Sequence, residues 1–370
     1  MPRFDPNNPP QGPCSPEPSP PSPDPAPGDF SRKIVAWFNA HGRHLPWRPD
    51  EDPYRIWLMV VMLQQTRVET VLPYYHRFVA AFPSLEDLAM ADEEHVLELW
   101  KGMGYYRRAR NLLAGAREMA STYRGRVPSD PAELMRLPGV GRYTAAAVTS
   151  IAFDAPVPAV DGNVQRFLSR LFAETGDITR PDTQKRLEEH ARILLPPAER
   201  GIHNQAVMDF GALVCAPVPR CADCPVAEVC LARSRGIERE LPTRPARRGT
   251  AIQEFVVARI LDQEGRTLLH RRPDDGLLAG FWEFPNVPAT KGDIRAAFQE
   301  TLGLCIEPGE ALGKVSHAFT HRRWLLDVRA ATLASAPPDT KDWHWSQTPR
   351  EETLPRAFSR ILSLFEGPDS

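Results

Sequence analysis

The sequence predicts an all-α domain over residues 30–230, a basic linker over 231–250 and an α+β module over 251–370. Two observations predict this order. Before the linker, the apolar residues recur every three or four positions, as in amphipathic helices; after it, they alternate as in strands. The 370 residues suffice for two domains of ordinary size. Residues 1–29 are crowded with Pro, Ser and Asp and predict a disordered tail.

The composition is that of an ordinary globular protein, with 42% hydrophobic and 25% charged residues. No run approaches the roughly 18 apolar residues of a membrane helix, and the N-terminus lacks the layout of a signal peptide. We therefore expect a cytoplasmic protein whose six cysteines are reduced or metal-bound. Residues 101–126 hold seven basic residues and one acidic residue, which suits either a solvated helix face or a face that follows phosphates.

Start and stop signals divide the all-α domain into helices. One helix should end at Gly42, the next should start after Pro53, and a third should run from about Val68 past Pro73. Ser84 and Asp92 are the expected N-caps of two short helices before a stop at Gly102, and further helices are expected at 106–122, 131–136 and 142–152 and from Asp161 onward.

The pattern changes beyond the linker. Residues 251–272 predict a strand, a Glu-Gly turn and a second strand. Residues 291–303 predict a helix, and residues 317–333 alternate as a single strand would. This mixture predicts the α+β class for the second module.

Four cysteines form the motif C-x5-C-x2-C-x5-C: Cys215, Cys221, Cys224 and Cys230. Four thiolates within sixteen residues predict a metal or cluster site, because packing alone rarely concentrates cysteine in this way. Thiolates select zinc or iron–sulfur clusters, and the spacing by itself leaves both open.

The stretch "LPGVGRYTAAAV", residues 137–148, predicts a turn that leads into a helix. Gly139 and Gly141 allow backbone N–H groups to converge on an anion at the helix N-terminus. With the helix expected before it, this is a helix-hairpin-helix signature that would clamp a DNA phosphate. The alternative is an ordinary turn between two helices.

Two further stretches allow a structural and a functional interpretation. In "AVDGNVQRF", Asp161 is either an N-cap or a carboxylate that stabilises the positive charge of sugar–base cleavage. In "GMGYYRRARN", Tyr105 on a glycine-flanked turn would wedge between bases while the arginines meet phosphates, whereas Tyr106 suits the core.

Together and in this order, these motifs resemble the adenine DNA glycosylase family, whose members remove adenine mispaired with 8-oxoguanine. The resemblance covers about residues 30–365 and includes "VMLQQTRVETVLPYY", "KGMGYYRRARNL", "VDGNVQRFLSRLF", "DFGALVC" and "GLLAGFWEFP". It implies a helix-hairpin-helix glycosylase domain with a [4Fe–4S] cluster on the four cysteines, followed by a Nudix-like 8-oxoguanine recognition domain. It also implies a monomer that acts on double-stranded nucleoid DNA and extrudes the target base.

The resemblance assigns roles to individual positions. It implies that Asp161, Asn163 and Tyr143 are catalytic, and because related lyases carry a Schiff-base lysine where Tyr143 stands, no strand cutting is expected. The residues implied to line the base pocket are Arg43, Trp47, Arg48, Leu63 and Gln205. Those implied to contact DNA or the lesion are Gln64, Gln65, Thr66, Met103, Tyr105, Gly139, Gly141, Phe319, Thr320 and His321.

The sequence departs from the family at the general acid. Family members have a glutamate where Val60 stands, and valine cannot protonate a departing base. Asp209 or a carboxylate from a distant segment is the alternative proton donor. The first cysteine gap is also five residues where the family usually has six, and "APVPR" offers only Arg220 as a cation. The segment "DIRAAFQETLGL" lacks the glutamates of a Nudix hydrolase, so pyrophosphatase activity is not expected.

Three hypotheses follow. The first is a monofunctional glycosylase that removes adenine, or another base, from a mispair with 8-oxoguanine. The second is a protein that binds such mispairs without excision. The third is a cluster protein with a redox or structural role and no DNA function.

Overall fold

The computed structural model describes residues 27–48, 52–245, 251–273, 276–289, 292–319 and 322–365. These residues form two compact units. The first unit comprises the chain up to Val68, Val79–Met90 and Asn111–Pro245; the second comprises Glu69–Phe78, Ala91–Arg110 and the chain beyond Pro245. None of the helices in these ranges combines the length and the apolar character that crossing a bilayer would require.

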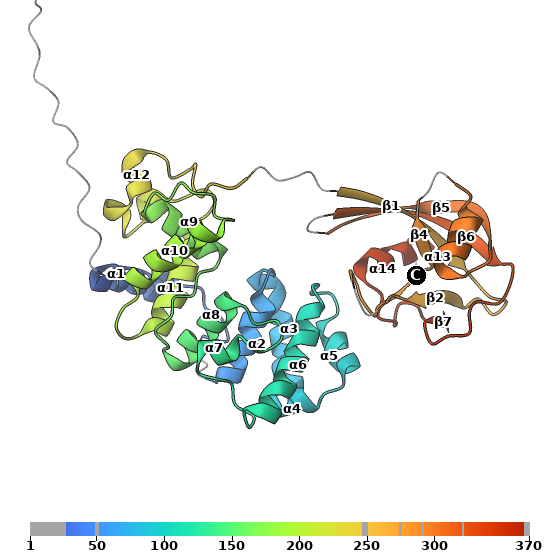
Figure 1. Ribbon diagram of the computed structural model, residues 1–370, viewed down its shortest axis with the longest axis horizontal. Helices are drawn as coiled ribbons and strands as arrows, with labels where there is room; N and C mark the ends of the chain where they lie inside the picture. Colours follow the sequence, from blue (N-terminus) through green and yellow to red (C-terminus); the bar gives the residue numbers. More distant parts are fainter. Residues whose placement is uncertain are drawn as a thin grey trace, which may run out of the picture. The chain divides into compact units, whose positions relative to one another are not determined.

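Helices build the N-terminal part of the chain (Figure 1). In chain order they are α1 (Pro27–His41), α2 (Pro53–Leu63), α3 (Val68–Ala81), α4 (Leu85–Met90), α5 (Glu93–Trp100), α6 (Arg107–Thr122), α7 (Pro131–Leu134), α8 (Arg142–Phe153), α9 (Gly162–Leu171), α10 (Pro181–Leu194), α11 (Arg200–Leu213) and α12 (Leu231–Arg235). Two short 3₁₀ turns, η1 (Cys221–Asp223) and η2 (Ala227–Val229), lie in the cysteine motif.

Most of the predicted helices are confirmed, and their caps explain why. Asp52 accepts a hydrogen bond from the backbone N–H of Tyr54 at the start of α2, where Pro53 occupies the first turn. Ser84 caps α4 by accepting from the N–H of Asp87 at 3.2 Å, and the Asp87 carboxylate accepts from the Ser84 N–H in return. Asp92 stands at the N-cap of α5 but makes no side-chain capping bond.

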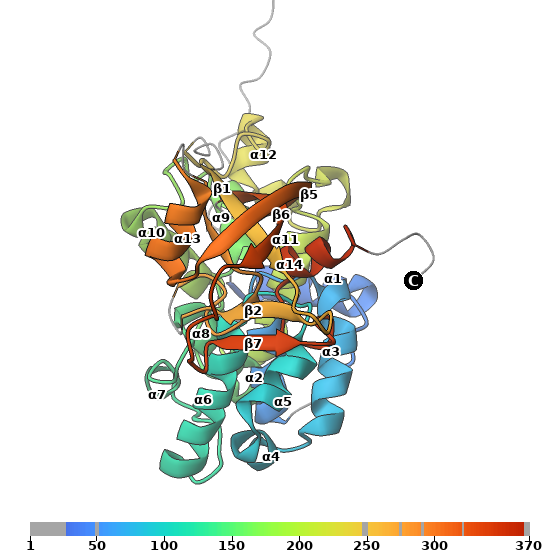
Figure 2. The same cartoon turned by 90° about the vertical axis from the view of Figure 1, so that its right-hand side faces the viewer.

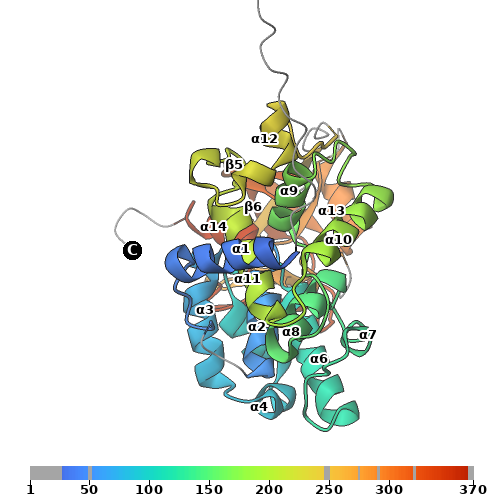
Figure 3. The ribbon, with the colours of Figure 1, turned by 90° about the vertical axis from the view of Figure 1, so that its left-hand side faces the viewer.

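Helices α10 and α11 are not among the predicted helices. Most side chains of α10 are charged or polar, which conceals a buried stripe of Leu187, Ala191 and Leu194. That stripe packs with α9 and α1 in one core (Figure 3). At its centre, the Phe167 ring stacks on Phe30 and meets Phe210 edge-on. Aromatic packing therefore fixes the face of α9 that carries Phe167.

The first part of the segment expected to be a linker over 231–250 is folded. Residues 231–235 form α12, with Ala232 fully buried, and Leu241 is also buried. The N–H of Ile178 donates to the carbonyl of Thr243, so this segment is bonded to the helical unit. Residues 246–250 lie outside the described residues.

Beyond residue 250, the described part of the second unit contains two β-sheets and two helices. The strands β1 (Ala251–Ile260), β4 (Asn286–Pro288), β5 (Ile306–Ala318) and β6 (Arg322–Leu333) form one sheet in the order β4-β1-β6-β5, in which β1 and β6 are parallel. The strands β2 (Thr267–Arg271), β3 (Trp282–Glu283) and β7 (Trp343–Ser346) form the other, with β2 beside β7 (Figure 2). The helices are α13 (Ile294–Leu302) and α14 (Arg356–Leu362).

The single strand predicted over 317–333 is wrong. Residues up to Ala318 belong to β5 and residues from Arg322 belong to β6, and these strands pair antiparallel. The hydrophobic alternation continues on both sides of the turn, so it does not reveal the reversal. The predicted strands near 251–260 and 267–271 and the helix at 294–302 are confirmed.

A buried histidine ties α1 to α11. His203 is 3% exposed, and its Nδ1 lies 2.9 Å from the hydroxyl of Ser31. Burial lowers the pKa of His203 to about 4. The folded protein therefore resists protonation of this ring, while the unfolded chain protonates it below its ordinary pKa of 6.5.

We expect the free energy of unfolding to decrease as the pH falls from about 6.5 towards 4, by up to about 3 kcal/mol, because only the unfolded state takes up this proton. Urea unfolding at several pH values measures this slope. His203→Asn should flatten it, whereas His76→Gln, at an exposed position, should keep it. An unchanged slope in His203→Asn would show that another group causes the acid sensitivity.

Candidate active site

Asp161 occupies the N-cap of α9 and is held on both carboxylate oxygens. Its Oδ1 accepts from the backbone N–H groups of Asn163 at 2.9 Å and Val164 at 2.7 Å. Its Oδ2 accepts from the side-chain amide of Asn163 at 3.0 Å. The structural interpretation of Asp161 is thus confirmed, and the same bonds hold the carboxylate at one position as a preorganised negative group.

Burial gives Asp161 and the nearby Tyr143 unusual proton affinities. Burial raises the pKa of Asp161, although the hydrogen bonds from Val164 and Asn163 oppose the shift. The pKa of Tyr143 is raised first by burial and then by the negative charge of Asp161. The Tyr143 hydroxyl donates to the Met208 sulfur at 3.3 Å. This tyrosine therefore stays a neutral phenol near neutral pH.

Hydrogen bonds connect Asp161 to the cysteine loop. The Asn163 side chain, which donates to Asp161, accepts from Nη2 of Arg166 at 2.9 Å. The same Nη2 donates to the carbonyl of Gly211, and Nε of Arg166 donates to the carbonyl of Cys215 at 2.9 Å. One side chain on α9 thus links the carboxylate to the first cysteine.

A second arginine on α9 holds the start of the cysteine loop. Arg170 is 2% exposed, and its guanidinium donates to the carbonyls of Cys215, Ala216 and Pro217 and to that of Leu241. Its Nη1 also lies 3.4 Å from the Cys215 sulfur. A buried guanidinium is costly unless its donors are satisfied, and these carbonyls satisfy it.

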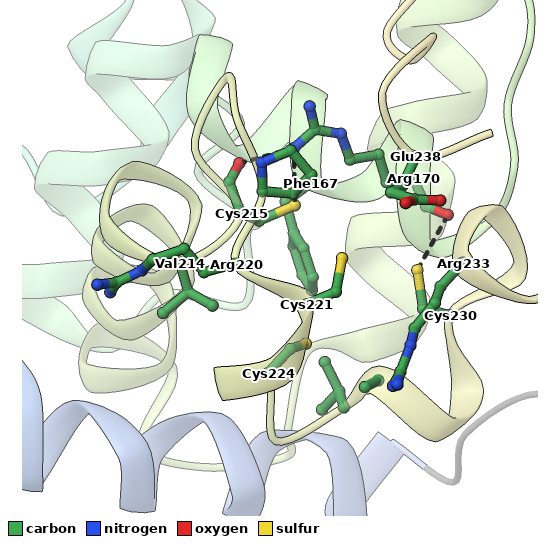
Figure 4. Close-up of a pocket in the computed structure, with 13 residues that line it drawn as sticks. Phe167, Arg170, Val214, Cys215, Arg220, Cys221, Cys224, Cys230, Arg233 and Glu238 are labelled. Carbon is green, nitrogen blue, oxygen red and sulfur yellow. Dashed lines mark hydrogen bonds between the residues drawn. The ribbon is translucent and has the colours of Figure 1, made fainter. Parts of the chain in front are cut away.

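The four motif cysteines line one pocket, shown in Figure 4: Cys215, Cys221, Cys224 and Cys230. Burial, and to a smaller extent the negative charges of the other three cysteines, raise the pKa of Cys224 to about 12, although a backbone hydrogen bond from Val226 opposes the shift. In the described ranges, no three Cys, His, Asp or Glu side chains converge tightly enough for a single metal ion. The four cysteine side chains line one shared space, and four thiols are a donor set for zinc or for an iron–sulfur cluster.

The shortened loop between the first two cysteines offers little positive charge. Arg220, its one cation, lies 3.7 Å from the Asp223 carboxylate. Val218 at the loop surface is 71% exposed. Weaker phosphate contact from this loop stays a prediction.

The Asp209 carboxylate forms ion pairs with two arginines. It is 1% exposed; Nε and Nη2 of Arg43 bind one carboxylate oxygen, and Nη2 of Arg48 lies 2.6 Å from the other. Arg48 also donates to the Arg43 carbonyl. Burial alone would raise the pKa of Asp209, but the bonds from the two arginines outweigh it and lower that pKa. Asp209 is therefore ionised and unsuited to donate a proton as a general acid.

The position expected to carry a general acid is apolar and enclosed. Val60 is 4% exposed on α2, within a helix of buried side chains. Among the residues expected around a base, Trp47 is buried, while Leu63 at the end of α2 and Gln205 on α11 are half-buried. The Gln205 amide donates to the Gly201 carbonyl of its own helix, at 3.5 Å.

The amides that follow α2 point in different directions. The Gln64 side chain donates to the hydroxyl of Thr144 on α8 at 2.9 Å, so it has an internal partner. Gln65 is exposed and adopts a left-handed backbone conformation, with φ of 57°. The Thr66 hydroxyl lies 3.4 Å from the Gln64 carbonyl. Of the two amides, Gln65 is the one presented to solvent.

The structure explains why glycine occupies two positions of the predicted helix-hairpin-helix. Gly139 has a φ of +75°, and a Cβ there would lie 2.6 Å from the side-chain nitrogen of Asn111. Gly141 is the N-cap of α8 and faces open space, because a Cβ at this position would meet no atom within 4 Å. The first turn of α8 is therefore free to present its N–H groups to an anion.

In the second unit, Tyr105 protrudes from a strained turn. It is 45% exposed with a φ of 51°, and the guanidinium of Arg108 lies 5.4 Å from its ring. The turn is held at Gly104, whose carbonyl accepts from Trp100 and Arg108. Met103 is 6% exposed, so it lies beneath this surface.

The turn between β5 and β6 is described only at its edges. Phe319 is half-buried against Trp324, with ring centroids 4.8 Å apart, and its N–H donates to the Arg322 carbonyl. Thr320 and His321 lie outside the described residues.

Sequence reasoning missed Thr144, Asn111, Arg166 and Arg170 as parts of the site. The arginines stand five and nine residues after Asp161, on the helix it caps, which was the one available signal. Thr144 and Asn111 gave no signal, because their partners are remote in sequence.

We expect Asp209→Ala to lower the free energy of unfolding by about 3 kcal/mol, because it leaves two arginines without their shared counter-charge. Urea unfolding measures the change. Asp29→Ala, which removes an exposed partner of Arg32, serves as the control and should have no measurable effect. Equal stability of Asp209→Ala and the wild type would refute the buried ion pair.

Comparison with known proteins identifies both parts of the chain. Residues 58–193 match the HhH-GPD superfamily of base excision DNA repair proteins, and residues 256–364 match the NUDIX domain. A thermostable thymine-DNA glycosylase of known structure is 31% identical with a TM-score of 0.52, and the match covers 57% of this chain and 97% of that one.

Similar proteins extend the match to nearly the whole chain. Rat adenine DNA glycosylase is 36% identical, over 89% of this chain and 73% of its own length. The human adenine DNA glycosylase is 33% identical, over 91% of this chain and 74% of its own length. With its helix-hairpin-helix domain followed by a Nudix domain, the chain belongs to the adenine DNA glycosylase family.

Proposed function

We propose that the protein is a monofunctional DNA glycosylase that removes the base paired with 8-oxoguanine. The base removed is adenine or, because Val60 stands at the position of the general acid, a base other than adenine. The observation that carries the proposal is the Asp161 carboxylate, fixed at the start of α9 by two backbone N–H groups and the Asn163 amide. Cleavage of a sugar–base bond develops positive charge on the sugar, and a fixed carboxylate stabilises that charge.

Tyr143 supports the monofunctional assignment. A lyase forms a Schiff base with the sugar, which requires an amine. A phenol forms none, and the raised pKa of Tyr143 keeps this phenol protonated. In the proposed reaction, water therefore completes the cleavage and leaves an abasic site.

With valine at position 60, the proposed reaction lacks the contribution of a general acid at this position. General acid catalysis typically contributes about 10²–10⁴-fold, or roughly 3–5 kcal/mol of barrier. Val60 has no proton to give, and Asp209 is held ionised by Arg43 and Arg48. We infer that the enzyme favours a base that leaves with little protonation, or removes adenine slowly.

Val60 also favours one alternative function. A protein that retains the elements for recognising the mispair and lacks the proton donor suits a binding role without excision. Both functions use the same DNA contacts, so they differ in the chemical step alone.

We propose the following DNA contacts for a monomer on a lesion duplex. Phosphate would bind at Gly139 and Gly141 before α8, and the exposed Gln65 and Tyr105 would enter the base stack. The remaining proposed contacts are Thr66, Met103, Phe319, Thr320 and His321 with the DNA or lesion, and Arg43, Trp47, Arg48, Leu63 and Gln205 with the extruded base. Gln64, which the resemblance also implies as a DNA contact, is bonded to Thr144 and is not included among them.

We also propose that the four cysteines hold a [4Fe–4S] cluster. The support is the pocket that all four line, together with the positive charge that Arg170 brings to Cys215. The cluster would supply covalent anchorage of residues 215–230. Arg166 and Arg170 would then transmit that anchorage to α9 and its N-cap.

Duplexes with each of the four bases opposite 8-oxoguanine, treated with alkali after incubation, test the proposed function. We expect cleavage at one mispair, and at least about a hundredfold less with Asp161→Asn, because the amide cannot stabilise the sugar cation. Tight binding without cleavage of any duplex would favour the binding function instead. Failure to prefer lesion duplexes would contradict both.

Val60→Glu tests the role of this position in the same assay. It should raise adenine excision by about 10²-fold or more, because it restores a proton donor. Val61→Glu places the same charge at the adjacent buried position and should not. If the two variants behave alike, Val60 does not determine the chemistry.

The purified protein should contain about four irons and four sulfides per chain and show iron–thiolate charge-transfer absorption. Cys224→Ser should lose both. Cys305→Ser is the matched control, because Cys305 lies in the second unit, with its sulfur beside the Gln299 amide. Zinc without sulfide would contradict the cluster proposal.

A further inference from the structure

The strained turn after α2 is hydrogen-bonded to α8, the helix that follows the hairpin turn. Gln64 ends α2, and its side-chain amide donates to the hydroxyl of Thr144 at 2.9 Å. Thr144 is 4% exposed on α8 and Gln64 is half-buried, so the acceptor end of this bond is shielded from water. A shielded bond between two helices fixes the distance between them more firmly than an exposed bond would.

Gln65, the next residue, needs such a restraint. Its left-handed backbone conformation is unfavourable for a residue with a Cβ, and its side chain is exposed. Strained conformations persist only where the surroundings fix them. Backbone bonds from Gln64 to Val61 and from Thr66 to Leu63 are long, at 3.3 Å each. The side-chain bond from Gln64 is shorter than either, so it restrains this turn more firmly.

The partner of Gln64 lies at the start of the hairpin helix. Thr144 is in the first turn of α8, directly after Tyr143 and three residues after the N-cap Gly141. One helical turn thus carries the proposed phosphate site, the pocket tyrosine and the attachment point of the Gln65 turn.

We infer that Gln64 is a positioning residue, whose bond to Thr144 holds Gln65 in the left-handed, outward conformation from which it enters the DNA stack. The inference rests on the proposed function, because it takes Gln65 to be the intruding group. It gives the two adjacent glutamines different tasks: Gln64 acts inside the protein and Gln65 acts on DNA.

Gln64→Met and Thr144→Val test the inference, because each keeps the size of its side chain and removes one half of the bond. The readouts are the ratio of binding constants for 8-oxoguanine and undamaged duplexes, and the fluorescence of 2-aminopurine beside the lesion, which rises when the stack opens. We expect each variant to lower the ratio by roughly 3- to 10-fold, the value of one neutral hydrogen bond. The double variant should be no worse than either single one.

Two further variants distinguish a loss of Gln65 positioning from a general loss of protein stability. Thr149→Val removes a buried hydroxyl from the same helix, one that donates to the Ala145 carbonyl at 2.7 Å, and should leave both readouts unchanged. Gln65→Ala removes the intruding amide. In that background, Gln64→Met should cause no further loss, because nothing remains to be positioned.

The outcomes distinguish this inference from the proposed function. If the wild type neither prefers lesion duplexes nor raises the fluorescence, the proposed function fails. If the wild type does both and Gln64→Met matches it, the positioning role is overturned and the proposed function stands. A loss from Gln64→Met that persists in the Gln65→Ala background also overturns it, because that loss reflects general destabilisation.

Discussion

The site depends on a buried carboxylate that is fixed by the helix it caps. Asp161 satisfies N–H groups at the start of α9, and those groups hold the carboxylate still. Burial would favour the neutral acid, and the hydrogen bonds favour the charged form. Because structural and chemical roles share these bonds, α9 must be rigid. The aromatic packing behind it and the two arginines beyond its first turn provide that rigidity.

Two carboxylates of the helical unit, Asp161 and Asp209, have different partners. Asp161 is held by neutral amides, which leaves its charge available, whereas Asp209 is neutralised by Arg43 and Arg48. Val60 is buried at the position where the resemblance implies a third carboxylate. In the proposed reaction, this arrangement would stabilise a sugar cation without a proton donor for the leaving base.

Backbone strain marks the two residues proposed to enter the DNA stack. Gln65 and Tyr105 both have left-handed conformations and exposed side chains. Each is held by bonds from its neighbours, through Gln64 in one case and through the Gly104 carbonyl in the other. Strain of this kind keeps a side chain extended before any ligand arrives, so less ordering is needed on binding.

The sequence by itself determined the helical periods, the capping role of Asp161, the cysteine motif and the family, because each is written in residues that are near in the chain. The tertiary structure alone decided which carboxylate is neutralised and which glutamine faces inward. Asp209 meets Arg43 across 166 residues, and Gln64 meets Thr144 across 80. It also decided that α12 packs and that β5 turns into β6. Local patterns cannot specify such pairings, since they arise only when the folded chain brings distant segments into contact.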